Sequence, residues 1–214
     1  MSIRINLNIF LFVILFFITS QLEVYSLVML FALIHELGHL FCGVLLGFEA
    51  ECFKIMPLGF AVKFKTNIND YNIKILKSNL LTIKKLLINL AGPITNIIIV
   101  VVGLFFKVDL NIICANLVIL VFNLLPIYPL DGGRIINNIF KLFLGNKDAY
   151  KCSNNVSNVI VIIITIISSV AIYYFKNVAI LFALVFIWTL VIIENKRFKT
   201  YRKMYKLIEE KGFK

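Results

Sequence analysis

Charged side chains are scarce in this chain. Asp, Glu, Lys and Arg make up 15% of its 214 residues, whereas they are about a quarter of a typical soluble domain. Hydrophobic residues make up 61%, and four prolines and ten glycines leave the apolar runs mostly uninterrupted. This composition excludes an ordinary soluble domain, so we expect an all-α polytopic membrane protein.

Windows of about 20 apolar residues predict six transmembrane helices. Their approximate bounds are residues 5–22, 24–48, 86–106, 108–127, 156–175 and 177–194. The first run lacks a small-residue cleavage site and is followed almost at once by a second apolar run, so we expect a retained helix and not a removed signal peptide. Residues 1–194 then form one six-span domain. Residues 195–214 form a short basic tail, expected as an interfacial helix.

Acidic residues are half as numerous as basic ones, 11 against 22, for a net charge of +11. Such a charge could indicate nucleic acid, but nothing in the sequence suggests base reading, and no nucleic-acid partner is expected. If the N-terminus is cytoplasmic, 20 of the 22 basic residues lie inside, the exceptions being Lys107 and Lys176. The positive-inside rule therefore predicts a multi-pass protein of the bacterial cytoplasmic membrane with both termini, and the loops 49–85 and 134–155, in the cytoplasm. Contacts with anionic lipids of the bilayer are also expected.

Cysteine is also sparse, and its four positions show no CxxC spacing. Cys42, Cys52, Cys114 and Cys152 are scattered, which fits small core residues of a reduced protein better than a disulfide framework. A thiolate zinc ligand at Cys114, near the fourth span, stays open as an alternative.

The chain has only two histidines, and both lie in the run His35-Glu36-Leu37-Gly38-His39, inside the second span. Two imidazoles at i and i+4 project from one face of a helix and can reach a single Zn²⁺, while Glu36 is placed to act as a general base. Ionisable groups at membrane depth are costly, which favours a functional role. The alternative is a histidine pair hydrogen-bonded inside a helix bundle.

A catalytic zinc ion usually has three protein ligands, so two histidines leave one ligand to be found. Asp131 is the candidate, because it follows the fourth span in the segment NLLPIYPLDGG of residues 123–133. Pro126 and Pro129 cannot continue a regular helix, so we expect a broken fourth helix lining a wet cavity. The alternative is a Pro-Gly loop at a helix end with a solvated Asp.

The loop that follows the histidine helix has the pattern of a β-hairpin. Residues 52–56 and 60–65 flank a Pro57-Leu58-Gly59 turn, and Phe60 and Val62 alternate with Ala61 and Lys63. Such a hairpin could offer a strand edge to an unfolded substrate segment. A plain amphipathic connector on the membrane surface explains the pattern equally well.

Together, HELGH in a membrane span and NLLPIYPLDGG about 90 residues later resemble the site-2 protease family of intramembrane zinc metalloproteases, and the six spans most resemble its bacterial sporulation branch. The resemblance covers roughly residues 5–194 and implies that His35, His39 and Asp131 bind Zn²⁺ and that Glu36 is the general base. It also implies a membrane-associated protein substrate, a sporulation sigma-factor precursor being one candidate, together with inhibitory membrane protein partners and a homo-oligomer as further expectations. The segment 91–96, AGPITN, resembles a family element whose small residues allow close helix packing.

Several supporting roles accompany this assignment. Asn96 is expected to line the cavity, and Asn123 to donate to the oxyanion or to tie down the unwound helix near Pro126 and Pro129. About 20 residues follow the last predicted span, so we expect no counterpart here of the nucleotide-sensing C-terminal domain of the sporulation protease. The alternative function is a membrane zinc transporter or channel, which explains the ligands but gives Glu36 no special duty. A non-catalytic scaffold with a relic site is a further alternative.

Overall fold

The computed structural model describes residues 2–18, 20–56, 59–65, 75–175 and 178–210. The chain divides into two compact units, Met1–Leu124 and Leu125–Lys214. Each unit is described by itself.

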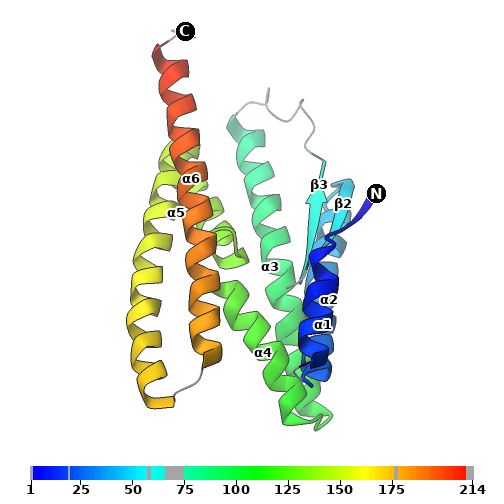
Figure 1. The fold of residues 1–214 in the computed structure, drawn as a ribbon. Helices are drawn as coiled ribbons and strands as arrows, with labels where there is room; N and C mark the ends of the chain where they lie inside the picture. The colour runs from blue at the N-terminus through cyan, green and yellow to red at the C-terminus, as the bar shows by residue number, and fades with distance from the viewer. Residues whose placement is uncertain (1, 19, 57–58, 66–74, 176–177, 211–214) are drawn as a thin grey trace. The chain divides into compact units, whose positions relative to one another are not determined.

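The first unit combines four helices with a small sheet (Figure 1). Its elements are β1 (Ser2–Ile5), α1 (Asn8–Ile18), α2 (Leu22–Leu45), β2 (Ala50–Met56), β3 (Gly59–Phe64), α3 (Ile75–Phe105) and α4 (Leu110–Leu124). Helix α2 contacts the other three helices and β3, so the histidine helix lies at the centre of this unit. The second unit consists of α5 (Asp131–Phe175) and α6 (Val178–Glu210), which pack side by side.

The predicted helical membrane protein is confirmed in its coarse features. Among the described residues, three helical stretches are long and apolar enough to cross a bilayer: Leu22–Leu45, Asn79–Phe105 and Asp131–Tyr174. Two shorter apolar helices, Ile9–Ile18 and Leu110–Leu124, fall below that length. The six-span count therefore stays a prediction. The break after the fourth predicted span is present, since α4 ends at Leu124 and α5 begins at Asp131.

The hairpin after α2 is confirmed, and the sheet is larger than expected. Strands β2 and β3 pair antiparallel, with Phe53 opposite Val62 and Ile55 opposite Phe60. The turn residues Pro57 and Leu58 lie outside the described part of the chain. Strand β1 adds to β2 in parallel, with Ser2 opposite Cys52. The sequence alone does not indicate this strand, because four residues ahead of an apolar run carry no strand pattern and their partner β2 lies about 50 residues away.

The prediction that residues 134–155 form a loop is wrong, because α5 runs from Asp131 to Phe175. Its one non-helical residue is Gly145, at φ 78° and ψ 171°, a conformation that glycine adopts without a β-carbon clash. Asn and Lys side chains indicated a solvated loop, but packing on α6 decides the conformation instead. Residues 195–210 of the predicted tail continue α6, whose sequence from residue 178 to 210 has neither glycine nor proline. Residues 211–214 lie outside the described part of the chain, and the interfacial location of the tail stays a prediction.

Candidate metal centre

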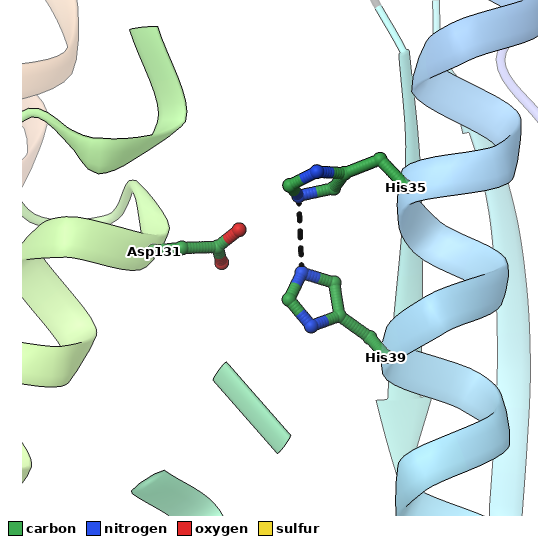
Figure 2. Close-up of side chains that lie close together, drawn as sticks. All are labelled: His35, His39 and Asp131. Atoms are coloured by element: carbon green, nitrogen blue, oxygen red, sulfur yellow. Dashed lines mark hydrogen bonds between the residues drawn. The ribbon is translucent and has the colours of Figure 1, made fainter. Parts of the chain in front are cut away.

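Helix α2 presents the two histidines on one face, as the i, i+4 spacing predicts. His35 and His39 are 3% and 5% exposed, and their Nε2 atoms lie 3.2 Å apart with the ring planes at 85° (Figure 2). Two neutral imidazoles this close must share one hydrogen between the two nitrogens or direct both lone pairs at a common cation. The pair therefore has the geometry of a two-nitrogen chelate.

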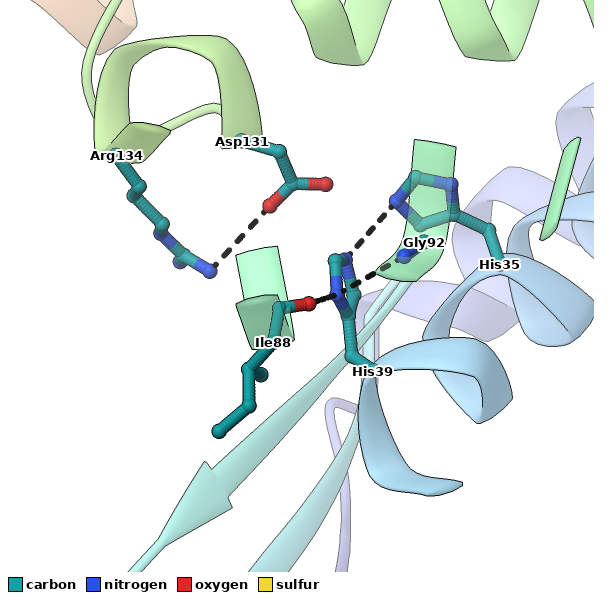
Figure 3. A network of polar contacts seen from close by, with 6 residues as sticks. All are labelled: His35, His39, Ile88, Gly92, Asp131 and Arg134. Atoms are coloured by element: carbon teal, nitrogen blue, oxygen red, sulfur yellow. Dashed lines mark hydrogen bonds and ion pairs between the residues drawn. The ribbon is translucent and has the colours of Figure 1, made fainter. Parts of the chain in front are cut away.

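Helix α3 fixes the orientation of the second imidazole. His39 Nδ1 lies 2.6 Å from the backbone carbonyl oxygen of Ile88 (Figure 3), and the Gly92 N–H lies 3.3 Å from the same nitrogen. A carbonyl oxygen only accepts, so the shorter contact requires the hydrogen on Nδ1, and the Gly92 contact is secondary. With the hydrogen on Nδ1, Nε2 of His39 carries the lone pair and can act as a metal ligand.

Gly92 of α3 faces both imidazoles, where no side chain would fit. A β-carbon at this position would lie 2.6 Å from Nε2 of His35 and closer still to Nε2 of His39. The same helix pair is close at Gly38, whose β-carbon would lie 3.1 Å from the Ala91 carbonyl oxygen. The close packing expected of the AGPITN segment is thus present between α2 and α3, and it leaves the space in front of the histidine nitrogens unfilled.

Glu36 follows His35 directly on α2 and is half-buried. Its position next to a ligand histidine is that of the general base in the HExxH pattern. Helix geometry alone places it there, since successive residues differ by about 100° around the axis.

In the second unit, Asp131 is the first residue of α5 and is 5% exposed. The Nη1 atom of Arg134 lies 3.7 Å from its Oδ1, one turn further along the helix (Figure 3). A carboxylate at a helix N-terminus is stabilised by the unpaired N–H groups there, and a carboxylate oxygen is a ligand that zinc accepts. Figure 2 draws Asp131 with the two histidines.

Comparisons with known proteins agree with these features. Residues 109–167 match peptidase family M50. Zinc metalloprotease MJ0392 of Methanocaldococcus jannaschii is 28% identical over 141 residues, which cover 61% of this chain and 38% of that protein. Stage IV sporulation protein FB of Bacillus subtilis is 27% identical over 159 residues, covering 70% of this chain and 52% of that protein. The resemblance to the site-2 proteases is confirmed.

The fold agrees with the same family. The solved site-2 protease from Methanocaldococcus jannaschii superposes with a TM-score of 0.59 at 22% identity, over 90% of this chain and 89% of that one. At this identity the likeness concerns the fold. The matched segments span about two fifths and one half of the two curated relatives.

The residues predicted to bind the substrate or to support the site lie on several different elements. Asn123 lies half-buried in the last turn of α4, and Pro126 and Pro129 lie in the non-helical segment after it. Phe60 and Val62 lie half-buried on β3. Asn96 is fully buried in α3, and within the described part of the chain its side-chain amide has no hydrogen-bond partner.

Several contributors were missed from sequence. Asn116 of α4 is fully buried and donates through Nδ2 to the Asn96 backbone carbonyl oxygen at 2.9 Å. An amide in the middle of an apolar helix is the signal that the sequence offers for it. The backbone carbonyl of Ile88 carried no signal at all, because any residue type offers the same oxygen.

Proposed function

We propose that this chain is an intramembrane zinc metalloprotease that hydrolyses peptide bonds of membrane-associated proteins. His35, His39 and Asp131, each buried and each offering one ligand atom, would hold the zinc ion. The observation that carries the proposal is the separation of the two Nε2 atoms, 3.2 Å. Two nitrogen ligands bound at 2.0–2.1 Å to a tetrahedral zinc ion lie about 3.3–3.4 Å apart, so this pair fits the ion closely.

Bound zinc supplies Lewis acidity that polarises a scissile carbonyl and activates water for attack. Glu36 takes the proton of the attacking water on its carboxylate and passes it to the nitrogen of the leaving amine. Asn123 donates from its amide to the oxygen on which negative charge develops. The Nδ1–H of His39 stays on the Ile88 carbonyl oxygen and holds the ring in place throughout.

Strand β3 is proposed as the edge that receives the substrate. A β-carbon on Gly59 would lie 3.9 Å from that of Ala32, and one on Gly43 would overlap the Phe64 ring, so β3 runs beside α2 past both histidines. Among the described strands β3 pairs only with β2, which leaves its other edge available. A peptide added there is extended, so its carbonyl groups are accessible, and Phe60 and Val62 would contact its side chains.

Membrane placement and partners complete the proposal. We assign a six-span domain over residues 1–194 and a basic tail over 195–214, with both termini cytoplasmic, because that orientation leaves 20 of 22 basic residues inside. The likeness to stage IV sporulation protein FB makes a sporulation sigma-factor precursor one candidate substrate. Inhibitory membrane proteins and a second copy of the chain are further proposed partners.

The decisive experiment replaces Glu36 by Gln, which keeps the side chain's size but removes its ability to accept a proton. The purified protein is assayed for bound zinc and for cleavage of a panel of membrane-tethered reporter proteins. We expect Glu36→Gln to retain zinc and to lose about 10²–10⁴-fold in cleavage rate. The matched control is Glu23→Gln, an acid in the first turn of the same helix, which should cleave like the parent.

The outcomes separate the proposal from its rival. A zinc transporter would keep most of its zinc flux into vesicles after Glu36→Gln and would cleave nothing in either form. Equal cleavage by the parent and the Gln variant would show that Glu36 is not the base.

A further inference from the structure

The non-helical segment that leads into Asp131 folds back over the start of α5. The Leu130 N–H donates to the Ile127 carbonyl oxygen at 2.9 Å, and the Arg134 N–H donates to the Leu130 carbonyl oxygen at 3.0 Å. A β-carbon on Gly133 would lie 2.6 Å from the Ile127 carbonyl oxygen, and Ile127 is fully buried. We call residues 125–130 the ligand loop, because its fold sets where Asp131 begins the helix.

A hydrogen bond ties the ligand loop to a distant turn of α5. The Tyr128 N–H donates to Ser157 Oγ at 3.1 Å, and the Ser157 hydroxyl donates to the Ser153 carbonyl oxygen at 3.0 Å. Both serines are 2% exposed. The loop is thereby held at its midpoint and not only at its ends.

Besides the hydrogen bond to Ser157, the ligand loop is held by Tyr150, which connects it to α6. Its ring meets the Tyr128 ring edge-on at 6.2 Å and packs against Phe198 and Tyr201 of α6 at 5.5 and 5.0 Å. Its hydroxyl donates to a carboxylate oxygen of Glu194. Tyr150 therefore lies between the loop that precedes Asp131 and the helix that carries the basic tail.

Burial of the Glu194 carboxylate carries a free-energy cost. It is 3% exposed, and Arg197 Nη1 lies 3.6 Å from its Oε2. A buried carboxylate costs several kcal/mol unless it is paired and hydrogen-bonded. Its pairing with Tyr150 fixes the direction of the Tyr150 ring.

Packing of α5 on α6 has a separate polar contribution that does not involve the ligand loop. Asn195 Nδ2 donates to Asn158 Oδ1 at 2.9 Å, and Asn154 Nδ2 donates to Asn195 Oδ1 at 3.0 Å. This amide network joins the same two helices at neighbouring turns. The network therefore provides a control for effects that come only from the helix interface.

We propose that Tyr150, oriented by Glu194, is a positioning residue for Asp131, and that it sets the affinity of the metal centre through the ligand loop. The inference rests on the proposed function, in that Asp131 is a zinc ligand. Side chains that hold a ligand in place typically contribute 10–100-fold to metal affinity, because a loose ligand must be ordered when the metal binds. Because Phe198 and Tyr201 of α6 pack against the Tyr150 ring, movement of α6 would displace Tyr150 and, through the ligand loop, Asp131.

The test compares Tyr150→Leu, Tyr150→Phe and Asn158→Leu in the purified full chain by two measurements. Zinc affinity is measured by competition with a chelator, and hydrogen–deuterium exchange of the peptide covering residues 125–131 is measured on metal-free protein. We expect Tyr150→Leu to weaken zinc binding about 10–100-fold and to accelerate exchange in the ligand loop by about 10-fold or more. Tyr150→Phe keeps the ring contacts and should show a smaller effect in both.

Each result supports or overturns the inference. Asn158→Leu should leave loop exchange and zinc affinity within about two-fold of the parent, because the amide network joins α5 to α6 and includes no residue of the ligand loop. Equal effects of Asn158→Leu and Tyr150→Leu would overturn the inference, as would unchanged loop exchange in Tyr150→Leu. A parent protein that binds no zinc contradicts the proposed function, while loop exchange still decides the role of Tyr150. Glu194→Gln, which can still accept from the Tyr150 hydroxyl, should perturb the loop less than Glu194→Leu.

Discussion

His39 and Ile88 are joined by a 2.6 Å contact between the imidazole Nδ1 and the backbone carbonyl oxygen, so α3 sets the tautomer of a histidine on α2. A backbone partner cannot be removed by changing the Ile88 side chain. The contact therefore depends on the two helices staying close, which the small residues Gly38, Ala91 and Gly92 permit.

Gly92→Ala should weaken zinc binding while leaving the fold intact. The new β-carbon would lie 2.6 Å from Nε2 of His35, where a metal ion would bind. We expect a loss of at least about 10-fold in zinc affinity, measured by chelator competition. Gly103→Ala on the same helix is the control, since its β-carbon would meet the side chains of Ile113, at 3.2 Å, and Val108, at 3.9 Å, and no histidine. Normal zinc binding by Gly92→Ala would contradict the assigned ligand geometry.

Elemental analysis of ligand variants tests the ligand set directly. His35→Phe and Asp131→Asn should each lose most of the zinc found in the parent, because a site with two protein ligands binds weakly. Cys114→Ala should keep it, which would dismiss a thiolate ligand. Full zinc occupancy in His35→Phe would rule out the set proposed here.

Membrane orientation is tested by labelling single-cysteine variants in intact cells with an impermeant maleimide. A cysteine placed at Asp109 or Lys176 should be labelled from outside, and Cys152 should not be labelled until the cells are permeabilised. The expectation follows from the distribution of basic residues. Strong external labelling of Cys152 would overturn the topology.

The hairpin should be stabilised by its ion pairs at neutral pH and not in acid. Hydrogen bonding to Lys65 lowers the pKa of Glu49, and hydrogen bonding to Lys63 lowers the pKa of Glu51, across Nζ to Oε2 distances of 2.9 Å in both pairs. A lowered carboxyl pKa means that the stabilisation is present above the ordinary Glu pKa and is lost as the pH falls through the folded value. The pairs are exposed, so the effect is small and decreases with salt.

Thermal unfolding of the detergent-solubilised protein measures this effect. The double variant Glu49→Gln, Glu51→Gln should melt slightly below the parent at neutral pH, and the two should converge below about pH 3, where both carboxyls are protonated. A difference that persists unchanged in acid would show that the ion pairs are not its cause. On the alkaline side, the raised pKa of Lys65 preserves its pair beyond the ordinary lysine range.

The local sequence pattern is sufficient to predict those parts of the site that lie within a single helix, strand or loop. The i, i+4 spacing puts His35 and His39 on one helical face wherever the helix packs, and Pro126 and Pro129, two prolines within four residues, disfavour a continuous helix. The alternation of Phe60 and Val62 with their neighbours predicted β3 for the same reason. These features depend on backbone geometry over a few residues, which the sequence specifies directly.

The tertiary structure decided what depends on contacts between distant segments. Four long-range contacts each join residues about 45 to 60 positions apart. They are the pairing of Ser2 with Cys52, the Ile88 carbonyl on His39, the space that Gly92 leaves before the two histidine nitrogens, and the contact of Tyr150 with Glu194. The type of each residue does not predict its partner, because a carbonyl oxygen, a glycine or a tyrosine can contact many different neighbours. Helix formation at residues 134–155 followed the same rule, since packing on α6 outweighed a polar composition typical of loops. The sequence by itself thus determined which groups carry the chemistry, and long-range packing determined how they are held.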